Sequence, residues 1–232
     1  MLRSPRFPWR LAPGVFALDA FFWAWCYLLV GDETLLVDTG VPWRDRAILR
    51  AIRATGIDPA KVDRIVLTHF DVDHSGSARA LAAALGATVA LHAADVPYLA
   101  HPSACPARRL SYFGPIPRII GWRRPRADQV LHEGDSVGGW HVLHTPGHTP
   151  GSISLLRDGV LVAGDALVHL RGALRPNRRM LSGDWAAELG SARRLAGLDA
   201  QLVLPGHYSP CAKPGALADL LRRLDRSRPP AR

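Results

Sequence analysis

Short apolar segments that run directly into a His or Asp recur along this chain and constrain how it can fold. Four such places are the polar cluster at 68–77, His148 after Pro146-Gly147, Asp165 after Gly164, and His207 after Pro205-Gly206. The segments before them are rich in Val, Ile and Leu and too short for helices, so they predict buried strands. Each polar side chain is therefore expected at the end of a strand, where Gly and Pro fix the backbone and allow close approach.

The order of strands and helices predicts an α/β fold. A chain of 232 residues with 48% hydrophobic and 21% charged residues suits one globular domain, and we assign residues 1–232 to it. Strands come first and helices later in both halves, which favours two mixed sheets packed face to face with helices outside. Residues 95–128 show no clear period and predict an irregular insertion, and the Arg/Pro tail at 226–232 is expected to be frayed.

The polar cluster holds four candidate metal ligands within six residues: His69, Asp71, Asp73 and His74. Taken alone, each has an ordinary explanation, since Asp73 can cap the following helix and a single His is commonly structural. Together with His148, Asp165 and His207 they supply four imidazoles and three carboxylates. That set suffices for two metal ions that share one carboxylate.

The order of these motifs resembles that of the metallo-β-lactamase-fold superfamily of hydrolases. From about residue 13 to residue 220 the matching elements are Asp38-Thr39-Gly40, the H-F-D-V-D-H-S-G run at 69–76, Pro146-Gly147-His148-Thr149, Gly164-Asp165 and Pro205-Gly206-His207. The resemblance implies a four-layer αβ/βα sandwich with the metal site at one edge between the two sheets. Segments over that edge, such as the insertion at 95–128, then shape a substrate pocket.

The resemblance also implies a ligand set. One metal ion would be held by His69, Asp71 and His148, and a second by Asp73, His74 and His207, with Asp165 bridging the two. Asp38 corresponds to a position that orients a ligand imidazole or supports the ligand loop.

Asp71 departs from the usual H-x-H-x-D-H motif of that superfamily. A carboxylate is a harder, anionic ligand than the imidazole it replaces, and it shifts the preference toward iron or manganese. Two divalent metal ions remain the expected cofactors. Zinc is the first choice, with iron or manganese as alternatives because of Asp71.

The function implied is metal-dependent hydrolysis of an ester, lactone, thioester or similar carbonyl substrate through a metal-bridging hydroxide. Asp73 is the expected catalytic residue, orienting the hydroxide and carrying a proton to the leaving group. One alternative is a di-iron redox enzyme of flavodiiron type, which Asp71 favours, although we expect no second domain to hold a flavin. The other is a phosphodiesterase or nuclease, which the net charge of +9 favours.

The positive charge is carried almost wholly by Arg, since Lys61 and Lys213 are the only lysines among 29 basic residues. The Arg residues are dispersed, so we attribute the charge to composition and expect a small-molecule substrate without a nucleic-acid partner. A homodimer remains open.

The three cysteines, Cys26, Cys105 and Cys211, form no C-x-x-C motif, which argues against a disulfide framework. We therefore expect reduced thiols and a cytoplasmic location. The apolar run from Val15 to Gly31 is interrupted by Asp19 and is too short for a membrane span.

Several residues have open roles. The remaining histidines are expected to be structural or exposed: His92, His101, His132, His141, His144 and His169. The aromatic residues of the insertion either line the pocket or pack locally: Tyr98, Tyr112, Phe113 and Trp122. Its basic residues either favour an anionic substrate or are solvated: Arg108, Arg109, Arg123, Arg124 and Arg126. Tyr208, next to His207, can donate a hydrogen bond to a carbonyl or oxyanion.

Overall fold

The first half of the chain builds a seven-stranded mixed sheet. The fold comes from a computed structural model that describes residues 7–19, 24–105 and 121–226. The strands lie in chain order: β1 (Trp9–Ala12), β2 (Val15–Asp19), β3 (Cys26–Val30), β4 (Thr34–Val37), β5 (Val62–Val66), β6 (Thr88–His92) and β7 (Gln129–Leu131). Pairing is antiparallel from β1 to β4 and parallel from β4 to β7. The carboxyl ends of β4, β5 and β6 therefore meet at one edge.

The second half builds a five-stranded sheet in the order β14-β11-β10-β9-β8. Its strands are β8 (Ser136–Val137), β9 (Trp140–His144), β10 (Ile153–Arg157), β11 (Val160–Gly164) and β14 (Leu202–Pro205). Of these strands only β11 and β14 pair in parallel, so their carboxyl ends also reach a common edge. A separate hairpin, β12 (Leu167–Leu170) with β13 (Ala173–Pro176), follows β11.

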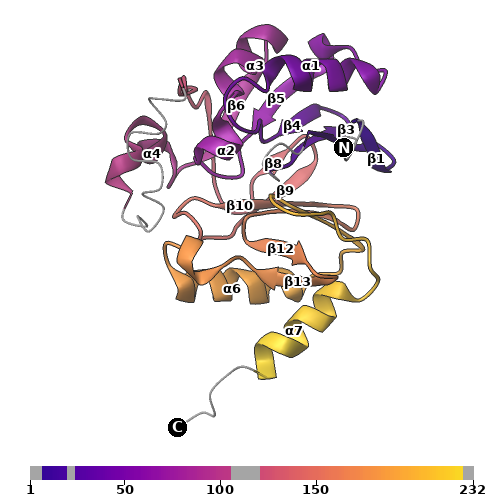
Figure 1. Cartoon of the computed structure of the whole chain (residues 1–232), viewed down its shortest axis with the longest axis vertical. Helices are drawn as coiled ribbons and strands as arrows, with labels where there is room; N and C mark the ends of the chain where they lie inside the picture. The colour runs from indigo at the N-terminus through magenta and orange to yellow at the C-terminus, as the bar shows by residue number, and fades with distance from the viewer. Residues whose placement is uncertain (1–6, 20–23, 106–120, 227–232) are drawn as a thin grey trace, which may run out of the picture.

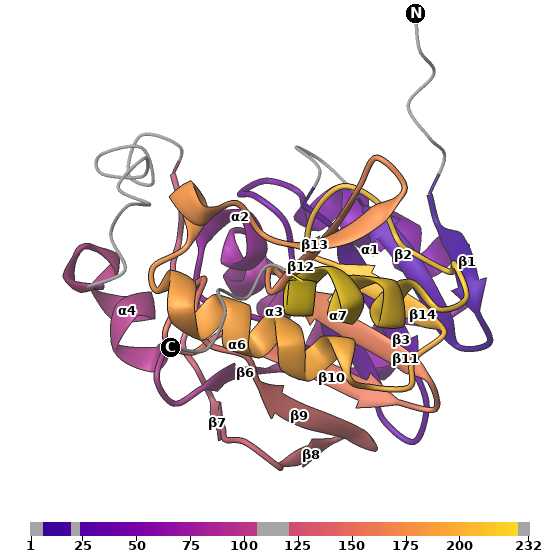
Figure 2. The ribbon, with the colours of Figure 1, turned by 90° about the horizontal axis from the view of Figure 1, so that it is seen from below.

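Helices cover the outer face of each sheet (Figure 1). On the first sheet lie α1 (Asp45–Ala54) and α3 (Ala78–Leu85), and on the second lie α6 (Trp185–Ala196) and α7 (Ala216–Arg226). Figure 2 shows α6 and α7 across the second sheet from below. In α1, Ile48, Ala51 and Ile52 are buried, the three-to-four-residue spacing of an amphipathic helix.

Three core clusters separate the four layers. One lies between the first sheet and its helices, one between the two sheets, and one between the second sheet and α6 with α7. Leu36, for example, faces α1 and α3, while its neighbours Leu35 and Val37 point into the space between the sheets. This alternation is what a strand buried on both faces requires, and it confirms the predicted αβ/βα sandwich.

The insertion and the tail are partly described. The insertion begins with a short helix, α4 (Val96–Ala100), and a 3-10 turn, η3 (Pro102–Ala104). Its Arg108, Arg109, Tyr112 and Phe113 lie outside the described residues. At the carboxyl end, α7 extends through Arg226, so only residues 227–232 of the expected tail lie outside the described residues.

Two further 3-10 turns are η2 (Pro59–Lys61) and η5 (Arg179–Leu181). Within the described parts of the chain, no helix has the length and apolar character needed to cross a bilayer.

Tyr27 joins the two sheets through a buried hydrogen bond. Its hydroxyl, on β3, donates to the carbonyl oxygen of Pro205 at the end of β14, at 2.8 Å. Tyr27 is fully buried, so removing the hydroxyl leaves that carbonyl without its partner. An unsatisfied buried acceptor typically costs about 1–3 kcal/mol.

We therefore expect Tyr27→Phe to lower the free energy of unfolding by about 1–3 kcal/mol in denaturant titrations. Tyr98→Phe is the control, because no hydrogen bond of the Tyr98 hydroxyl is found among the described residues. Equal stability of Tyr27→Phe and the unmodified chain would contradict the proposed role of this bond.

Candidate metal centre

The seven candidate ligands meet at the edge formed by the carboxyl ends of the strands. His69 and Asp71 follow β5, and Asp73 and His74 lie on the one-turn helix α2 (Val72–Ser75). The other three come from the second sheet. His148 follows β9, Asp165 follows β11, and His207 follows β14.

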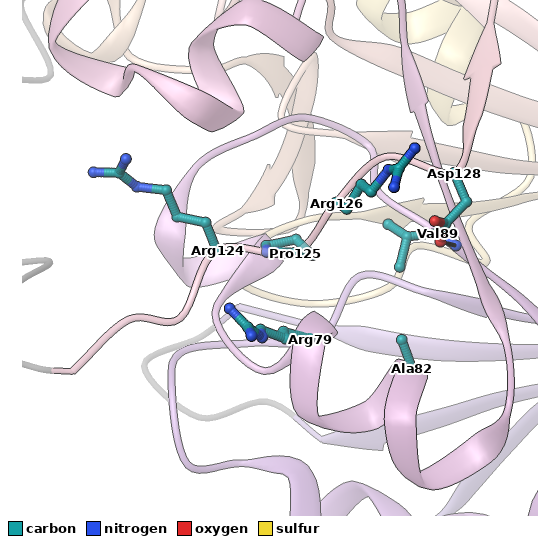
Figure 3. A pocket seen from close by; sticks show the side chains of 7 residues that line it. All are labelled: Arg79, Ala82, Val89, Arg124, Pro125, Arg126 and Asp128. Atoms are coloured by element: carbon teal, nitrogen blue, oxygen red, sulfur yellow. Dashed lines mark hydrogen bonds between the residues drawn. The ribbon is translucent and has the colours of Figure 1, made fainter.

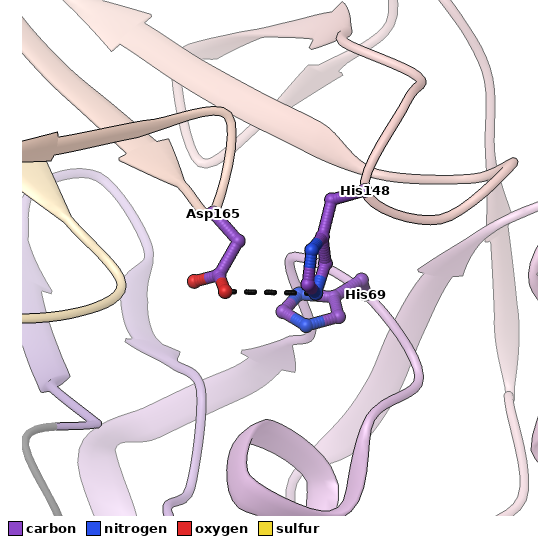
Figure 4. A group of neighbouring side chains, drawn as sticks. All are labelled: His69, His148 and Asp165. Atoms are coloured by element: carbon purple, nitrogen blue, oxygen red, sulfur yellow. Dashed lines mark ion pairs between the residues drawn. The ribbon is translucent and has the colours of Figure 1, made fainter. Parts of the chain in front are cut away.

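His69, Asp71 and His148 form one group. The Oδ2 atom of Asp71 lies 3.6 Å from Nε2 of His69 and 3.2 Å from Nε2 of His148. Figure 4 shows the two imidazoles together with Asp165, whose Oδ2 lies 3.5 Å from His148 Nε2. His69, His148 and Asp165 each present one ligand atom within 4.8 Å of the other two.

Asp73, His74 and His207 form the second group, again with ligand atoms within 4.8 Å of one another. The Nε2 atom of His207 lies 3.3 Å from Oδ2 of Asp73 and 3.2 Å from Nε2 of His74. Asp165 lies between the groups, because its Oδ1 is 3.5 Å from Nε2 of His74 in the second group and its Oδ2 is 3.5 Å from Nε2 of His148 in the first. This is the position predicted for a bridging carboxylate.

Asp38 orients His74 directly and His69 through the hydroxyl of Thr68. Its Oδ2 lies 2.8 Å from Nδ1 of His74 and also accepts a hydrogen bond from the Thr68 hydroxyl. The same hydroxyl lies 3.0 Å from Nδ1 of His69. With Nδ1 engaged on both rings, Nε2 is the nitrogen that faces the centre. Asp38 thus makes the supporting contact that the resemblance implies.

The donor set fits divalent cations. Nε2 of His69 and Oδ1 of Asp165 are buried and have no hydrogen-bond partner among the described residues. Buried polar atoms normally have partners, and unpartnered ligand-type atoms within these two groups are what cation binding would satisfy. Imidazole and carboxylate ligands suit zinc, iron and manganese.

The pKa values of two histidines also fit a cation site. Burial lowers the pKa of His74, but the charges of Asp38, Asp165 and Asp73 outweigh it and raise the pKa to about 9. Burial also lowers the pKa of His148, but the charge of Asp165 and the hydrogen bond and charge of Asp71 outweigh it and raise the pKa to about 9. In the absence of a cation, His74 and His148 hold protons that balance the carboxylates.

Three residues that support the site were missed by the sequence analysis. Asn177, just after β13, donates from Nδ2 to Oδ2 of Asp165 at 3.1 Å. Glu188 of α6 is buried, which raises its pKa, and its backbone packs against Gly147, next to the ligand His148. Asp95 is also buried, and its carboxylate contacts the loop of His69 and Asp71 and the loop of His148. Each is distant in sequence from the ligands it supports and carries no motif, so no local pattern marks it.

The backbone near His207 is packed against the site. A Cβ on Gly206 would collide with Oδ1 of Asp165, so only glycine allows this approach. Trp25 donates its backbone N–H to the Gly206 carbonyl and its indole N–H to the Tyr208 carbonyl, both at 2.8 Å. Tyr208 adopts a left-handed φ of 71°.

The histidines outside the predicted set stay outside the site. His92 stacks on His144 with ring centroids 4.0 Å apart, and Nδ1 of His169 lies 3.1 Å from Oγ of Ser209. Tyr98 and Trp122 pack on the cluster beneath the first sheet, which supports local packing for these two aromatic residues.

A basic pocket of about 390 Å³ lies on the surface of the first half, between α3 and the segment before β7 (Figure 3). It is lined by Arg79, Ala82, Val89, Arg124, Pro125, Arg126 and Asp128. Its three guanidinium groups point in different directions. None of the seven candidate ligands lines this pocket.

Comparison with known proteins agrees with the fold and the site. The sequence profile of the metallo-beta-lactamase superfamily matches residues 23–207. The probable metallo-hydrolase YflN of Bacillus subtilis is 29% identical over 215 residues, which cover 83% of this chain and 81% of YflN. A hydroxyacylglutathione hydrolase of Acidiphilium cryptum is 33% identical over 183 residues, 76% of this chain and 60% of that protein.

Among solved structures, a metallo-beta-lactamase family protein from Thermus thermophilus superposes with a TM-score of 0.70 at 27% identity. The superposition covers 94% of this chain and 80% of that protein. The profile spans most of the chain, the sandwich is the same, and the ligand-type side chains converge at its edge. This chain therefore belongs to the metallo-beta-lactamase superfamily and is a metal-dependent hydrolase.

Proposed function

We propose that this chain hydrolyses a small carbonyl substrate, a thioester first and an ester or lactone next, at a pair of divalent metal ions. The observation that carries the proposal is the convergence of two ligand groups on one shared carboxylate, Asp165, which contacts His148 of the first group and His74 of the second. The similarity to a hydroxyacylglutathione hydrolase supports a thioester as the first candidate. When bound, the two cations polarise the substrate carbonyl and lower the pKa of a water molecule.

Within this proposal, His69, Asp71 and His148 hold the first ion and Asp73, His74 and His207 hold the second, with Asp165 shared. Zinc is the proposed metal, and the carboxylate of Asp71 keeps iron and manganese as the alternatives to be distinguished by elemental analysis. A redox-active ion in the purified protein would favour the flavodiiron-type alternative.

The substrate approaches from the side of Asp73 and His207. Their side chains are 24% and 20% exposed, whereas those of His69, His74 and Asp165 are at most 3% exposed. Among the seven candidate ligands, the exposed side chains therefore lie at one end of the cluster. A carbonyl group presented there meets the buried carboxylate and imidazoles from their solvent side.

Asp73 transfers the proton from water to the leaving group in this mechanism. Burial raises the pKa of its carboxyl group, but the neighbouring His74 and His207 lower it below its ordinary value. The group is therefore ionised near neutral pH and accepts a proton from the attacking water. It then passes that proton to the departing sulfur or oxygen of the substrate. His74, held by Asp38, keeps Asp73 and the shared carboxylate in place.

Asp73→Asn tests this role directly. We expect hydrolysis of thioester and p-nitrophenyl ester probes at saturating metal to fall about a hundred- to ten-thousand-fold, because the amide accepts no proton. Asp32→Asn, whose carboxylate is 88% exposed, is the matched control and is expected to keep full activity. Full activity of Asp73→Asn would reject the assignment.

Metal binding is expected to release protons. Because the pKa values of His74 and His148 are raised to about 9, both imidazoles are protonated near pH 7.5 in the metal-free chain. A metal ligand must be a neutral imidazole, so binding expels these protons. Apparent metal affinity should therefore rise with pH up to about 9.

Calorimetric titration of the metal-free protein with zinc, in two buffers of different ionisation enthalpy, measures this release. We expect at least one proton released per chain near pH 7.5 and fewer as the pH approaches and passes 9. Heats that do not depend on the buffer would show that these imidazoles do not bind the metal.

A further inference from the structure

Asp95 stands immediately before the first residue of α4, but its side chain does not act as a helix cap. It is the N-cap residue of α4, where an Asp side chain ordinarily accepts a hydrogen bond from the first turn of its own helix. Here the side chain makes no such cap. The residue is completely buried, so its carboxylate needs other donors.

Those donors come from the two loops that carry the first ligand group. Oδ2 of Asp95 accepts from the backbone N–H of Phe70 at 3.1 Å and from the Thr149 hydroxyl at 2.8 Å. Its Oδ1 accepts from the N–H of Gly151 at 2.6 Å. One carboxylate thus joins the loop after β5, in the first sheet, to the loop after β9, in the second.

The residues that donate to Asp95 are neighbours, in the sequence, of the ligands proposed for the first ion. Phe70 lies between His69 and Asp71, and Thr149 directly follows His148. The ligands of the second ion are held by other contacts, since Asp38 orients His74 and Trp25 holds the backbone on both sides of His207.

Gly151 shows that this contact is closely fitted. A Cβ at this position would lie 2.6 Å from Cγ and from the backbone nitrogen of Asp95. The loop after β9 therefore reaches the carboxylate only because residue 151 has no side chain. Hydrogen bonds to an ionised carboxylate are shorter and stronger than bonds between neutral groups.

We propose that Asp95 is a positioning residue for the first ion alone: it sets the distance between the loop of His69 and Asp71 and the loop of His148. This inference rests on the proposed dinuclear function, since it assigns a support to one of its two ligand groups. Outer partners of metal ligands typically change metal affinity about 10–100-fold. Loss of Asp95 should weaken one metal site and spare the other.

The test is zinc competition with a chelating dye on the full chain, which resolves two affinities. Asp95→Asn keeps the size of the side chain but turns one accepting oxygen into an NH2 that faces a donor. We expect one of the two zinc affinities to fall about 10–100-fold and the other to change less than about threefold. After dialysis, the variant should retain about one zinc per chain.

Two further variants keep the test decisive. Thr149→Val removes one of the three bonds and, should Asp95→Asn fail to fold, is expected to weaken the same site by a smaller factor. Leu217→Ala removes buried side-chain volume from α7, in the cluster beneath the second sheet, and controls for loss of stability. It should leave both zinc affinities unchanged.

The outcomes separate this inference from the proposed function. If the unmodified chain binds no pair of zinc ions, the dinuclear function fails. If it binds two, and the Asp95 and Thr149 variants bind both unchanged, only the role of Asp95 fails. If both sites weaken equally in these variants, Asp95 is a general structural residue and the site-selective role is overturned.

Discussion

The burial of several carboxylates at one edge of the sandwich is the constraint on which the rest of this structure depends. Asp71 and Asp165 are almost fully buried, and Asp73 is mostly buried beside them. Buried anions are unfavourable unless positive charge compensates them. The imidazoles of His74, His148 and His207, whose pKa values are raised, supply it as protons when no cation is present, and divalent ions supply it when they bind. The raised pKa values of His74 and His148 and the unpartnered atoms of His69 and Asp165 express this balance.

The scaffold meets this constraint through topology and through a few polar supports. Parallel pairing of β4 with β5 and of β11 with β14 brings loops from both sheets to a common edge. Each supporting residue contacts a different ligand or ligand loop. Asp38 orients His74, Asn177 contacts the shared Asp165, and Asp95 joins the loops of the first ligand group. Strand ends hold the ligands, and Asp73 and His207 are the more exposed among them.

The sequence predicted the ligand cluster because its residues stand in local motifs at the ends of apolar strands. The sandwich followed from the order of strands and helices and from the resemblance. Asp95, Asn177 and Glu188 could not be found in this way. Asp95 looks like an ordinary helix cap in the sequence, and its carboxylate turns away from the helix only because tertiary packing brings Thr149 and Gly151 within reach.

Anomalous scattering from crystals of the protein as purified, recorded at the absorption edge of its metal, tests the central claim most directly. We predict two peaks, one among His69, Asp71 and His148 and one among Asp73, His74 and His207, with Asp165 between them. Peaks elsewhere, or none after the crystals are soaked in zinc, would contradict the account.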